Sequence, residues 1–234
     1  VAREIAADLE AAGSPVTRAD LKAYEARWRE PLSVKTRQAV LYNTPVPTQG
    51  LASLMILGIY EKLGIAEIDG VDHAHGLIEA TKRAFAHRDL HCIDFADATA
   101  DFEQLLSPAS LAAEAAQIEM RRAAPWPLPP AKGDTIWMGA IDKDGLAVSY
   151  IQSIYWEYGS GLNLPRTGVL MQNRGIAFSL DPASPRALKP GRRPFHTLNP
   201  AMAVFADGRV MSYGSMGGDG QPQFQAQVFT RIAA

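Results

Sequence analysis

The order of apolar and polar positions divides the chain into a helical half and a half rich in strands. In the first half, apolar residues recur at helical spacing, and two segments open on capping residues, Thr17 with Asp20 and Ser107 with Pro108. A β-rich stretch with prolines at its edges, residues 29–47, interrupts them and predicts strands. We predict helices over residues 2–12, 17–28, 51–63, 72–88 and 108–122.

Downstream of residue 134 the period changes from helix to strand. Residues 135–141 and 146–154 form one predicted hairpin, and residues 201–206 and 209–213 form another. Each pair is joined by an Asp-Gly turn, the residue pair that two-residue hairpin loops favour. The apolar runs do not alternate strictly with polar residues, which predicts sheets buried on both faces.

These elements predict one domain of mixed class. Neither half can cover its own apolar faces, so the helices and the strands are expected to pack on each other. We therefore predict an α/β (α+β) fold, a four-layer αββα sandwich.

Composition narrows the range of functions. The chain has 234 residues, of which 47% are hydrophobic and 21% charged, with a net charge of −2, as in an ordinary globular chain. No apolar run approaches the roughly 20 residues of a membrane span, and no basic patch indicates nucleic acid as a partner. The single cysteine, Cys92, excludes an internal disulfide framework. Because the chain begins with Val rather than Met, we expect a fragment of a longer protein. We expect the full-length protein in the cytoplasm, with the periplasm as the alternative.

Histidines and carboxylates give no metal signature. His87 and His91 are four residues apart, the spacing of a shared ligand pair on a helix, but no third ligand follows at a suitable distance. We expect no metal and no other cofactor.

The candidate chemistry begins at the junction of the two halves. Residues 124–134 hold four prolines and a glycine, and Thr135 then opens a strand-like run. If the Asp134–Thr135 bond is cut, Thr135 carries a hydroxyl nucleophile and, in its α-amino group, a base whose pKa is roughly 7.7–8.0. The alternative is structural, because a threonine at the start of a strand is commonly only a good strand former.

Several separated motifs resemble one family, the γ-glutamyltranspeptidases, which are N-terminal-nucleophile hydrolases. They are DTIWMGAIDKDGLAVS with the GSG of residues 159–161, then GRRPFHTLNPAMAVFADG, then YGSMGGDG. In that family a precursor cuts itself before a threonine, and an Asp-x-x-Gly turn begins seven residues later. Asp142 stands seven residues after Thr135, so the resemblance makes Asp134–Thr135 the cleavage site and Thr135 the nucleophile.

The resemblance also implies a division of the chain. Residues 1–134 correspond to the C-terminal part of a large subunit, with a proline-rich linker over 124–134, and residues 135–234 to the N-terminal part of a small subunit. The two parts are expected to form one intertwined domain and to stay associated after cleavage, and a homo-oligomer is possible.

Two further parts of the catalytic site follow from the same resemblance. Gly217 and Gly218 fall on the family's oxyanion-hole glycines, with Met216 in place of a proline; a simple loop is the alternative. Ser153 falls where the family has a threonine whose hydroxyl lies beside the nucleophile's amine. A strand serine facing solvent is the alternative there.

The substrate pocket departs from the transpeptidases. In the segment of residues 172–178, Ala177 stands where the family has the acid that binds the substrate's ammonium group, which argues against γ-glutamyl transfer. Arg174 adds a cation suited to a carboxylate. The predicted substrate-binding residues are Arg174, Tyr155, His196, Thr197 and Asn173.

The pattern IQSIYWEYGSG with MQNRG resembles the oxamate amidohydrolase branch of the family. We therefore predict a self-processing amidohydrolase that acts on C–N bonds other than peptide bonds, with a small carboxylate-bearing amide such as oxamate as substrate. The alternatives are a γ-glutamyl transferase or hydrolase acting on glutathione, or a cephalosporin-acylase-like enzyme. Ile136 and Trp137, which replace the family's usual Thr-His, keep open an alternative of a different class, a non-catalytic relative that serves as a binding or assembly module.

Overall fold

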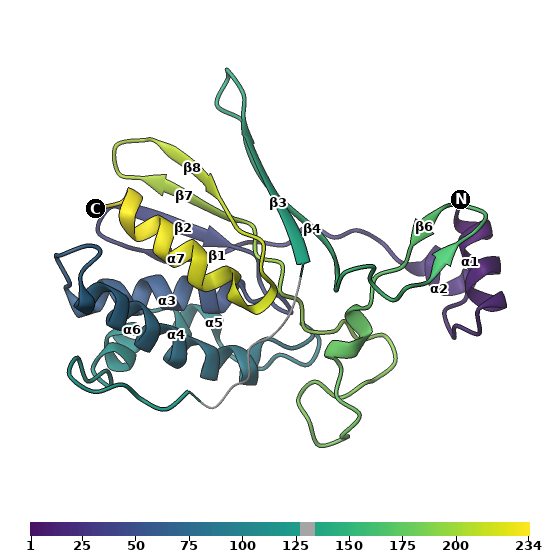
Figure 1. The fold of residues 1–234 in the computed structure, drawn as a ribbon, viewed down its shortest axis with the longest axis horizontal. Helices are drawn as coiled ribbons and strands as arrows, with labels where there is room; N and C mark the ends of the chain where they lie inside the picture. The colour runs from purple at the N-terminus through teal and green to yellow at the C-terminus, as the bar shows by residue number, and fades with distance from the viewer. Residues whose placement is uncertain (127–133) are drawn as a thin grey trace.

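The computed structural model describes residues 1–126 and 134–234, and Figure 1 shows their arrangement. The helices are α1 (Ala2–Ala11), α2 (Arg18–Ala23), α3 (Gly50–Leu63), α4 (Val71–His91), α5 (Phe102–Leu105), α6 (Pro108–Ala115) and α7 (Gln221–Ile232), with 3-10 turns η1 (Arg174–Ala177) and η2 (Gly218–Gly220). The strands are β1 (Leu32–Lys35), β2 (Ala39–Asn43), β3 (Asp134–Ile141), β4 (Ala147–Tyr155), β5 (Asn163–Leu164), β6 (Val169–Leu170), β7 (Ala201–Phe205) and β8 (Val210–Tyr213).

An antiparallel sheet of order β1-β2-β7-β8 is built from both halves of the chain. Strand β2 precedes residue 134 and β7 follows it, and the two pair in the register Leu41 opposite Ala203. Helices α3 and α7 lie against one face of this sheet, and α4 packs on both of these helices (Figure 1). The upstream and downstream parts therefore share one sheet and one core.

Helix α3 is the centre of that core. Its residues from Gly50 to Tyr60 are all buried, because the helix contacts α4, α6, α7 and the sheet on different sides. A helix that is apolar around its whole circumference is stable only in such surroundings. It ends at Gly64, which adopts the left-handed conformation that glycine accepts without strain.

Strands β3 and β4 form a hairpin that lies beside β8 and extends beyond the sheet (Figure 1). Trp137 lies against Gly214, where a Cβ atom would come within 2.1 Å of the Trp137 ring. The opposite face carries Ile136, Met138 and Tyr150, all exposed in this chain. Within the described residues the hairpin is therefore covered on one face only, and its β4 residues mostly alternate between partly buried and exposed.

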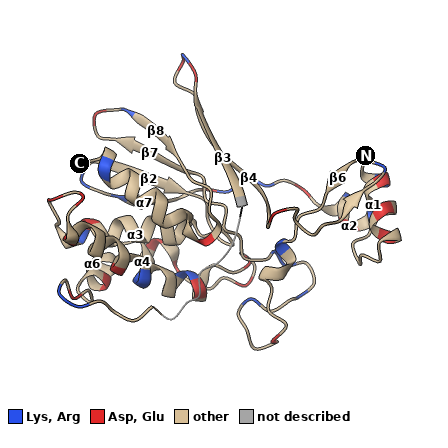
Figure 2. Ribbon diagram, in the orientation of Figure 1, with Lys and Arg blue, Asp and Glu red and all other residues tan. Residues whose placement is uncertain are grey.

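Charged residues are concentrated away from the hairpin. The coloured ribbon of Figure 2 shows acidic and basic residues along the helices, whereas strands β3 and β4 are nearly free of charged residues except near the hairpin tip. Within residues 1–126 and 134–234, no helix has the length and apolarity that crossing a membrane requires.

Several element bounds differ from the sequence predictions. Helix α2 ends at Ala23 rather than residue 28, and α6 ends at Ala115 rather than residue 122, and the residues that follow each helix are mostly exposed. Helix α4 continues to His91, with the buried Arg88 anchoring its last turn. Residues 127–133 of the predicted proline-rich linker lie outside the described part of the chain.

Candidate active site

Two hydroxyl groups meet at the base of the hairpin. The pairing of β3 with β4 shifts register between Asp134 and Ile136, so that Thr135 stands at an irregularity of the ladder and is buried. Its hydroxyl donates a hydrogen bond to Ser153 Oγ at 3.2 Å. Ser153 Oγ also accepts the backbone N–H of Tyr155 at 2.8 Å. A threonine nucleophile placed here has a second hydroxyl beside it.

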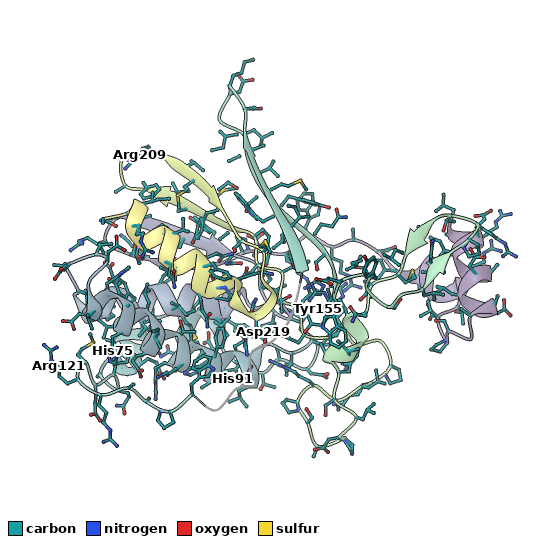
Figure 3. All side chains as sticks on the ribbon, viewed as in Figure 1. His75, His91, Arg121, Tyr155, Arg209 and Asp219 are labelled. Carbon is teal, nitrogen blue, oxygen red and sulfur yellow. The ribbon has the colours of Figure 1, made fainter. Side chains whose placement is uncertain are left out.

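Tyr155 connects this pair to a buried cation. Its φ angle is +83°, a conformation that is strained for a bulky residue and that occurs where surrounding contacts impose it. The Arg174 guanidinium lies over its ring, 4.4 Å from the centroid. Burial raises the pKa of the Tyr155 hydroxyl, and the Asp219 carboxylate raises it further. Figure 3 shows Tyr155 and Asp219 together near the base of the hairpin.

Arg174 is a buried guanidinium with donors to spare. Only 3% of the residue is exposed, and its Nη1 donates to Thr197 Oγ1 at 2.8 Å. Within the described residues, its Nε and Nη2 have no hydrogen-bond partner. Burial lowers the pKa of Arg174 to about 10, opposed by the charges of Tyr155 and Asp219, so the group stays cationic at neutral pH. Two free donors on one planar fork suit a carboxylate ligand.

His196 and Asn173 take less direct positions. Burial, with the nearby charge of Arg174, lowers the pKa of His196 to about 4, so its imidazole is neutral at pH 7. Asn173 Oδ1 accepts the backbone N–H of Trp156 at 3.1 Å, which engages it in holding the chain after β4. Asp134 pairs with Tyr155 through the β3–β4 ladder, and its side chain lies outside the described atoms.

The glycine turn lies between β8 and α7. Gly217 and Gly218 both have positive φ, +105° and +54°, and a Cβ atom at Gly217 would come within 2.8 Å of Phe224. Within the described residues, neither backbone N–H donates to another protein group in a recorded hydrogen bond. Two successive amides of this kind can bind a developing oxyanion.

Three residues that the sequence analysis did not single out hold this turn. Gln49, at the start of α3, donates its side-chain amide to the carbonyl of Gly218 at 2.8 Å. Arg88, buried on the Phe85 ring, pairs loosely with Asp219 at 3.7 Å. No sequence motif marks Gln49 or Arg88; only the fold brings α3 and α4 to the turn. Asp219 has a sequence signal, because it follows the two glycines directly.

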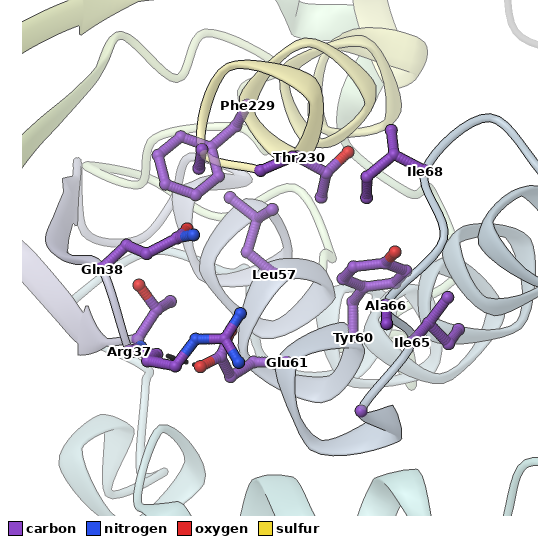
Figure 4. Close-up of a pocket in the computed structure, with 14 residues that line it drawn as sticks. Arg37, Gln38, Leu57, Tyr60, Glu61, Ile65, Ala66, Ile68, Phe229 and Thr230 are labelled. Atoms are coloured by element: carbon purple, nitrogen blue, oxygen red, sulfur yellow. Dashed lines mark hydrogen bonds between the residues drawn. The ribbon is translucent and has the colours of Figure 1, made fainter.

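Elsewhere in the described part of the chain we find no second group of residues suited to catalysis or metal binding. The described part holds no cluster of three or more His, Cys, Asp or Glu residues arranged for a metal ion. His87 instead bonds Glu114 at 2.9 Å. A separate cavity of ≈ 250 Å³ lies between the ends of α3 and α7 (Figure 4). Its lining mixes apolar residues with polar ones such as Arg37, Gln38 and Glu61, and none of the predicted site residues contributes to it.

Comparison with known proteins places this geometry in context. The family model described as Gamma-glutamyltranspeptidase matches residues 1–234. The oxamate amidohydrolase proenzyme of Klebsiella pneumoniae is 53% identical over 231 residues, which are 99% of this chain and 44% of that protein. The glutathione hydrolase-like YwrD proenzyme of Bacillus subtilis is 38% identical, again over 99% of this chain and 44% of that protein. The chain thus spans less than half the length of these curated relatives.

The fold agrees with a solved structure. The crystal structure of cephalosporin acylase from Bacillus halodurans superposes with a TM-score of 0.89 at 37% identity, covering 99% of this chain and 42% of that one. The predicted mixed α/β fold of the N-terminal-nucleophile hydrolase type is confirmed by this match. The described residues contribute the helix layer and the sheet on which it packs.

Proposed function

The chain belongs to the γ-glutamyltranspeptidase family, and from that premise we propose that the full-length protein is a self-processing amidohydrolase with Thr135 as its nucleophile. The relatives named as proenzymes support the processing step. The hydroxyl pair of Thr135 and Ser153 at the base of the hairpin supports the choice of nucleophile.

Self-cleavage would use the hydroxyl of Thr135 on its own peptide bond. The Thr135 oxygen attacks the Asp134 carbonyl carbon, the C–N bond breaks, and the nitrogen takes a proton to become the free α-amine of Thr135. Water then hydrolyses the ester, which returns the hydroxyl and leaves a carboxylate on Asp134. Strands β2 and β7 pair across the cleavage point, so we propose that the two products stay associated.

Substrate turnover would repeat the same attack on an external amide. The α-amine of Thr135 accepts the hydroxyl proton, and Thr135 Oγ adds to the amide carbonyl. The backbone N–H groups of Gly217 and Gly218 stabilise the oxyanion, and the amine returns the proton to the departing nitrogen. Water then hydrolyses the acyl-enzyme and restores Thr135.

The observation that carries the substrate proposal is Arg174, buried and cationic with two donors unpaired within the described residues. Such a group favours an amide that bears a carboxylate. Ala177, at the end of η1, offers no charge to the ammonium group of a γ-glutamyl substrate. A small acid amide such as oxamate fits both conditions, and the Klebsiella relative carries oxamate in its name.

The test compares three amides with full-length, processed enzyme. Oxamate, a γ-glutamyl anilide and a neutral acyl amide are supplied in parallel, and release of ammonia or aniline is followed. We expect oxamate to be hydrolysed fastest. Faster turnover of the γ-glutamyl compound would contradict the interpretation of Ala177, and equal use of neutral and anionic amides would contradict that of Arg174. No turnover by processed enzyme would favour the non-catalytic alternative.

Replacing the cation should weaken binding of the acid amide. We expect Arg174→Met to raise KM for oxamate about 10- to 100-fold, since a hydrogen bond to a charged group contributes about 1.5–3 kcal/mol. Arg209→Met is the control, because Arg209 is exposed and contacts Asp207 and the Phe205 ring rather than a predicted site residue. The KM for the neutral amide should change little in either variant.

A further inference from the structure

Gln49 joins the two halves of the candidate site through a single nitrogen. The residue precedes α3 and is fully buried. Its Nε2 donates to the carbonyl oxygen of Thr197 at 2.8 Å and to that of Gly218, also at 2.8 Å. Both hydrogens of one amide group are therefore used on two separate backbone segments.

The orientation of this amide follows from its partners. Both acceptors are carbonyl oxygens, so the nitrogen must face them, because the amide oxygen would be repelled by both. The backbone of Gln49 is fixed as well. Its N–H donates to the carbonyl of His196 at 3.1 Å, and the N–H of His196 donates to the carbonyl of Pro47 at 2.9 Å. The side chain thus extends from a segment already paired to residues 196–197 and holds the glycine turn to it.

The two hydrogen bonds of Gln49 Nε2 limit the distance between the carbonyl groups of Thr197 and Gly218. The carbonyl oxygens of Thr197 and Gly218 lie 2.8 Å from the same nitrogen, so they are no further apart than twice that distance. The hydroxyl of Thr197 holds Arg174, and the N–H of Gly218 belongs to the candidate oxyanion turn. Gln49 therefore sets the separation between the group that would bind the substrate carboxylate and the group that would bind the oxyanion.

We propose that Gln49 is a positioning residue that selects acid amides with a short acyl group. This inference rests on the proposed function and adds to it the reason why a two-carbon acid amide is preferred. With Arg174 and the Gly218 N–H held close together, an acid amide whose carboxylate is adjacent to its amide carbonyl can contact both groups at once. A longer acyl group must fold or displace one of them.

Removing the side-chain amide of Gln49 should make the glycine turn less rigid and reduce the selectivity for short acyl groups. Gln49→Met keeps the size of the side chain but leaves two buried carbonyl groups without this donor. Gly218 then loses the contact that holds its left-handed backbone in place. Because misplacement of a reacting group by about 1 Å can cost about 10²-fold in rate, we expect kcat for oxamate to fall about 10- to 100-fold.

The experiment measures acyl-length selectivity in full-length, processed protein. Oxamate, malonamate and succinamate form a series in which only the spacer between carboxylate and amide grows. We expect the ratio of kcat/KM for oxamate to that for succinamate to fall at least about tenfold in Gln49→Met, since one or two methylene groups of length discrimination are worth roughly this much. An unchanged ratio would overturn the proposal.

Gln225→Met is the matched control. Gln225 is also buried, and its Nε2 donates to Asn199 O at 2.7 Å and to Asn199 Oδ1 at 2.8 Å, but it ties α7 to the chain before β7. Its Oε1 also accepts a hydrogen bond from Ser53 Oγ at 2.5 Å, so Gln225→Met should lose at least as much stability as Gln49→Met while keeping the wild-type selectivity. If Gln225→Met changed the ratio as much as Gln49→Met, the role of Gln49 would be only structural and the proposal would fail.

Two further measurements keep the test decisive. In Gln49→Glu, a buried carboxylic acid keeps one donor only while protonated, so kcat for oxamate should decline as pH rises through its pKa, unlike that of wild type. This variant replaces Gln49→Met if the latter does not fold.

Binding is tested without turnover by the thermal stabilisation that oxalate and succinate give. Wild type should prefer oxalate, and the Gln49 variants should not. A preference kept in the variants would overturn the proposal. Wild type that prefers oxalate but hydrolyses none of the amides would contradict the proposed function while leaving the role of Gln49 supported.

Discussion

Helix α3 and the β3–β4 hairpin differ sharply in burial. The helix is among the most buried elements of the described chain, and the hairpin is among the most exposed. Leu51, Leu54 and Ile56 of α3 are 0% exposed, whereas Ile136 and Tyr150 of the hairpin are 57% and 47% exposed. Yet the hairpin carries Thr135, the proposed nucleophile. Stability and chemistry are therefore assigned to different regions, and Gln49 connects the start of α3 to the glycine turn of the candidate site.

The two regions are also held by different forces. The helix layer is stabilised by apolar area removed from water, which is insensitive to direction. The site is held by a few directed contacts, namely the Thr135–Ser153 pair, Arg174 with Thr197, and the Gln49 bridge. Substitutions should therefore separate function from stability, and the predictions below test that separation.

The largest effect is expected at the nucleophile. Thr135→Ala removes the attacking oxygen, so self-cleavage and turnover should both be abolished, whereas Thr135→Ser should cleave slowly. Gel analysis of the purified protein and ammonia release measure the two activities. The melting temperature should stay close to that of uncleaved precursor. A Thr135→Ala protein that still splits at this bond would show that another group is the nucleophile.

A core substitution should do the reverse. Leu54→Ala should lower the free energy of unfolding by about 2–5 kcal/mol, because it leaves a cavity in a closely packed layer. Leu146→Ala, at the exposed end of the hairpin, should change it by less than about 0.5 kcal/mol. Denaturant unfolding of the full-length protein measures both. Similar losses at the two positions would contradict the contrast between the regions.

Within the site, the glycine turn should affect rate more than binding. Gly218→Val should lower turnover by about 10²-fold, because it tilts an oxyanion donor away from the developing charge. Gly145→Val is the control, since Gly145 also has positive φ but lies in open space at the hairpin turn. A valine there is also strained by the positive φ, and Gly145→Val should keep wild-type turnover in processed enzyme. Equal turnover of the two variants would remove Gly218 from the mechanism.

The smallest effect is expected on the stability of the folded protein at acidic pH, through His196. The pKa of His196 is about 4 in the folded protein, below the value of about 6.5 expected for an unfolded chain. As pH falls below 6.5 the unfolded state binds this proton first, so the contribution of His196 to stability is lost progressively down to about pH 4. The difference in melting temperature between wild type and His196→Gln should therefore shift against wild type over that range. A pH-independent difference would mean that His196 is not held neutral.

The sequence predicted elements whose cause is local and missed contacts that join distant segments. The capping box of Thr17 and Asp20 and the N-cap of Ser107 form as predicted, because their partners lie within one turn. Helix α7 carried no prediction. The ends of α2 and α6 were set too far downstream, because the residues that follow Ala23 and Ala115 are mostly exposed and gain little from helical packing.

In the candidate site, too, the residues in local motifs were predicted and those that depend on distant contacts were missed. Thr135, Ser153, Gly217 and Gly218 were identified because they stand in motifs with fixed spacing. Gln49 was missed because its role depends on two carbonyl groups, at residues 197 and 218, that only the folded chain brings to it. Arg174 was predicted as a carboxylate ligand, but its burial and its position over Tyr155 follow only from the fold.

The most direct test of the central claim is the mass of the full-length protein after purification. Self-processing at Thr135 predicts two chains, the first ending at Asp134 and the second beginning with a free amine on Thr135. Intact mass spectrometry resolves both, and terminal sequencing of the second chain identifies its first residue. A single uncleaved chain, or a cut at any other bond, would contradict the assignment of Thr135 as the self-processing nucleophile.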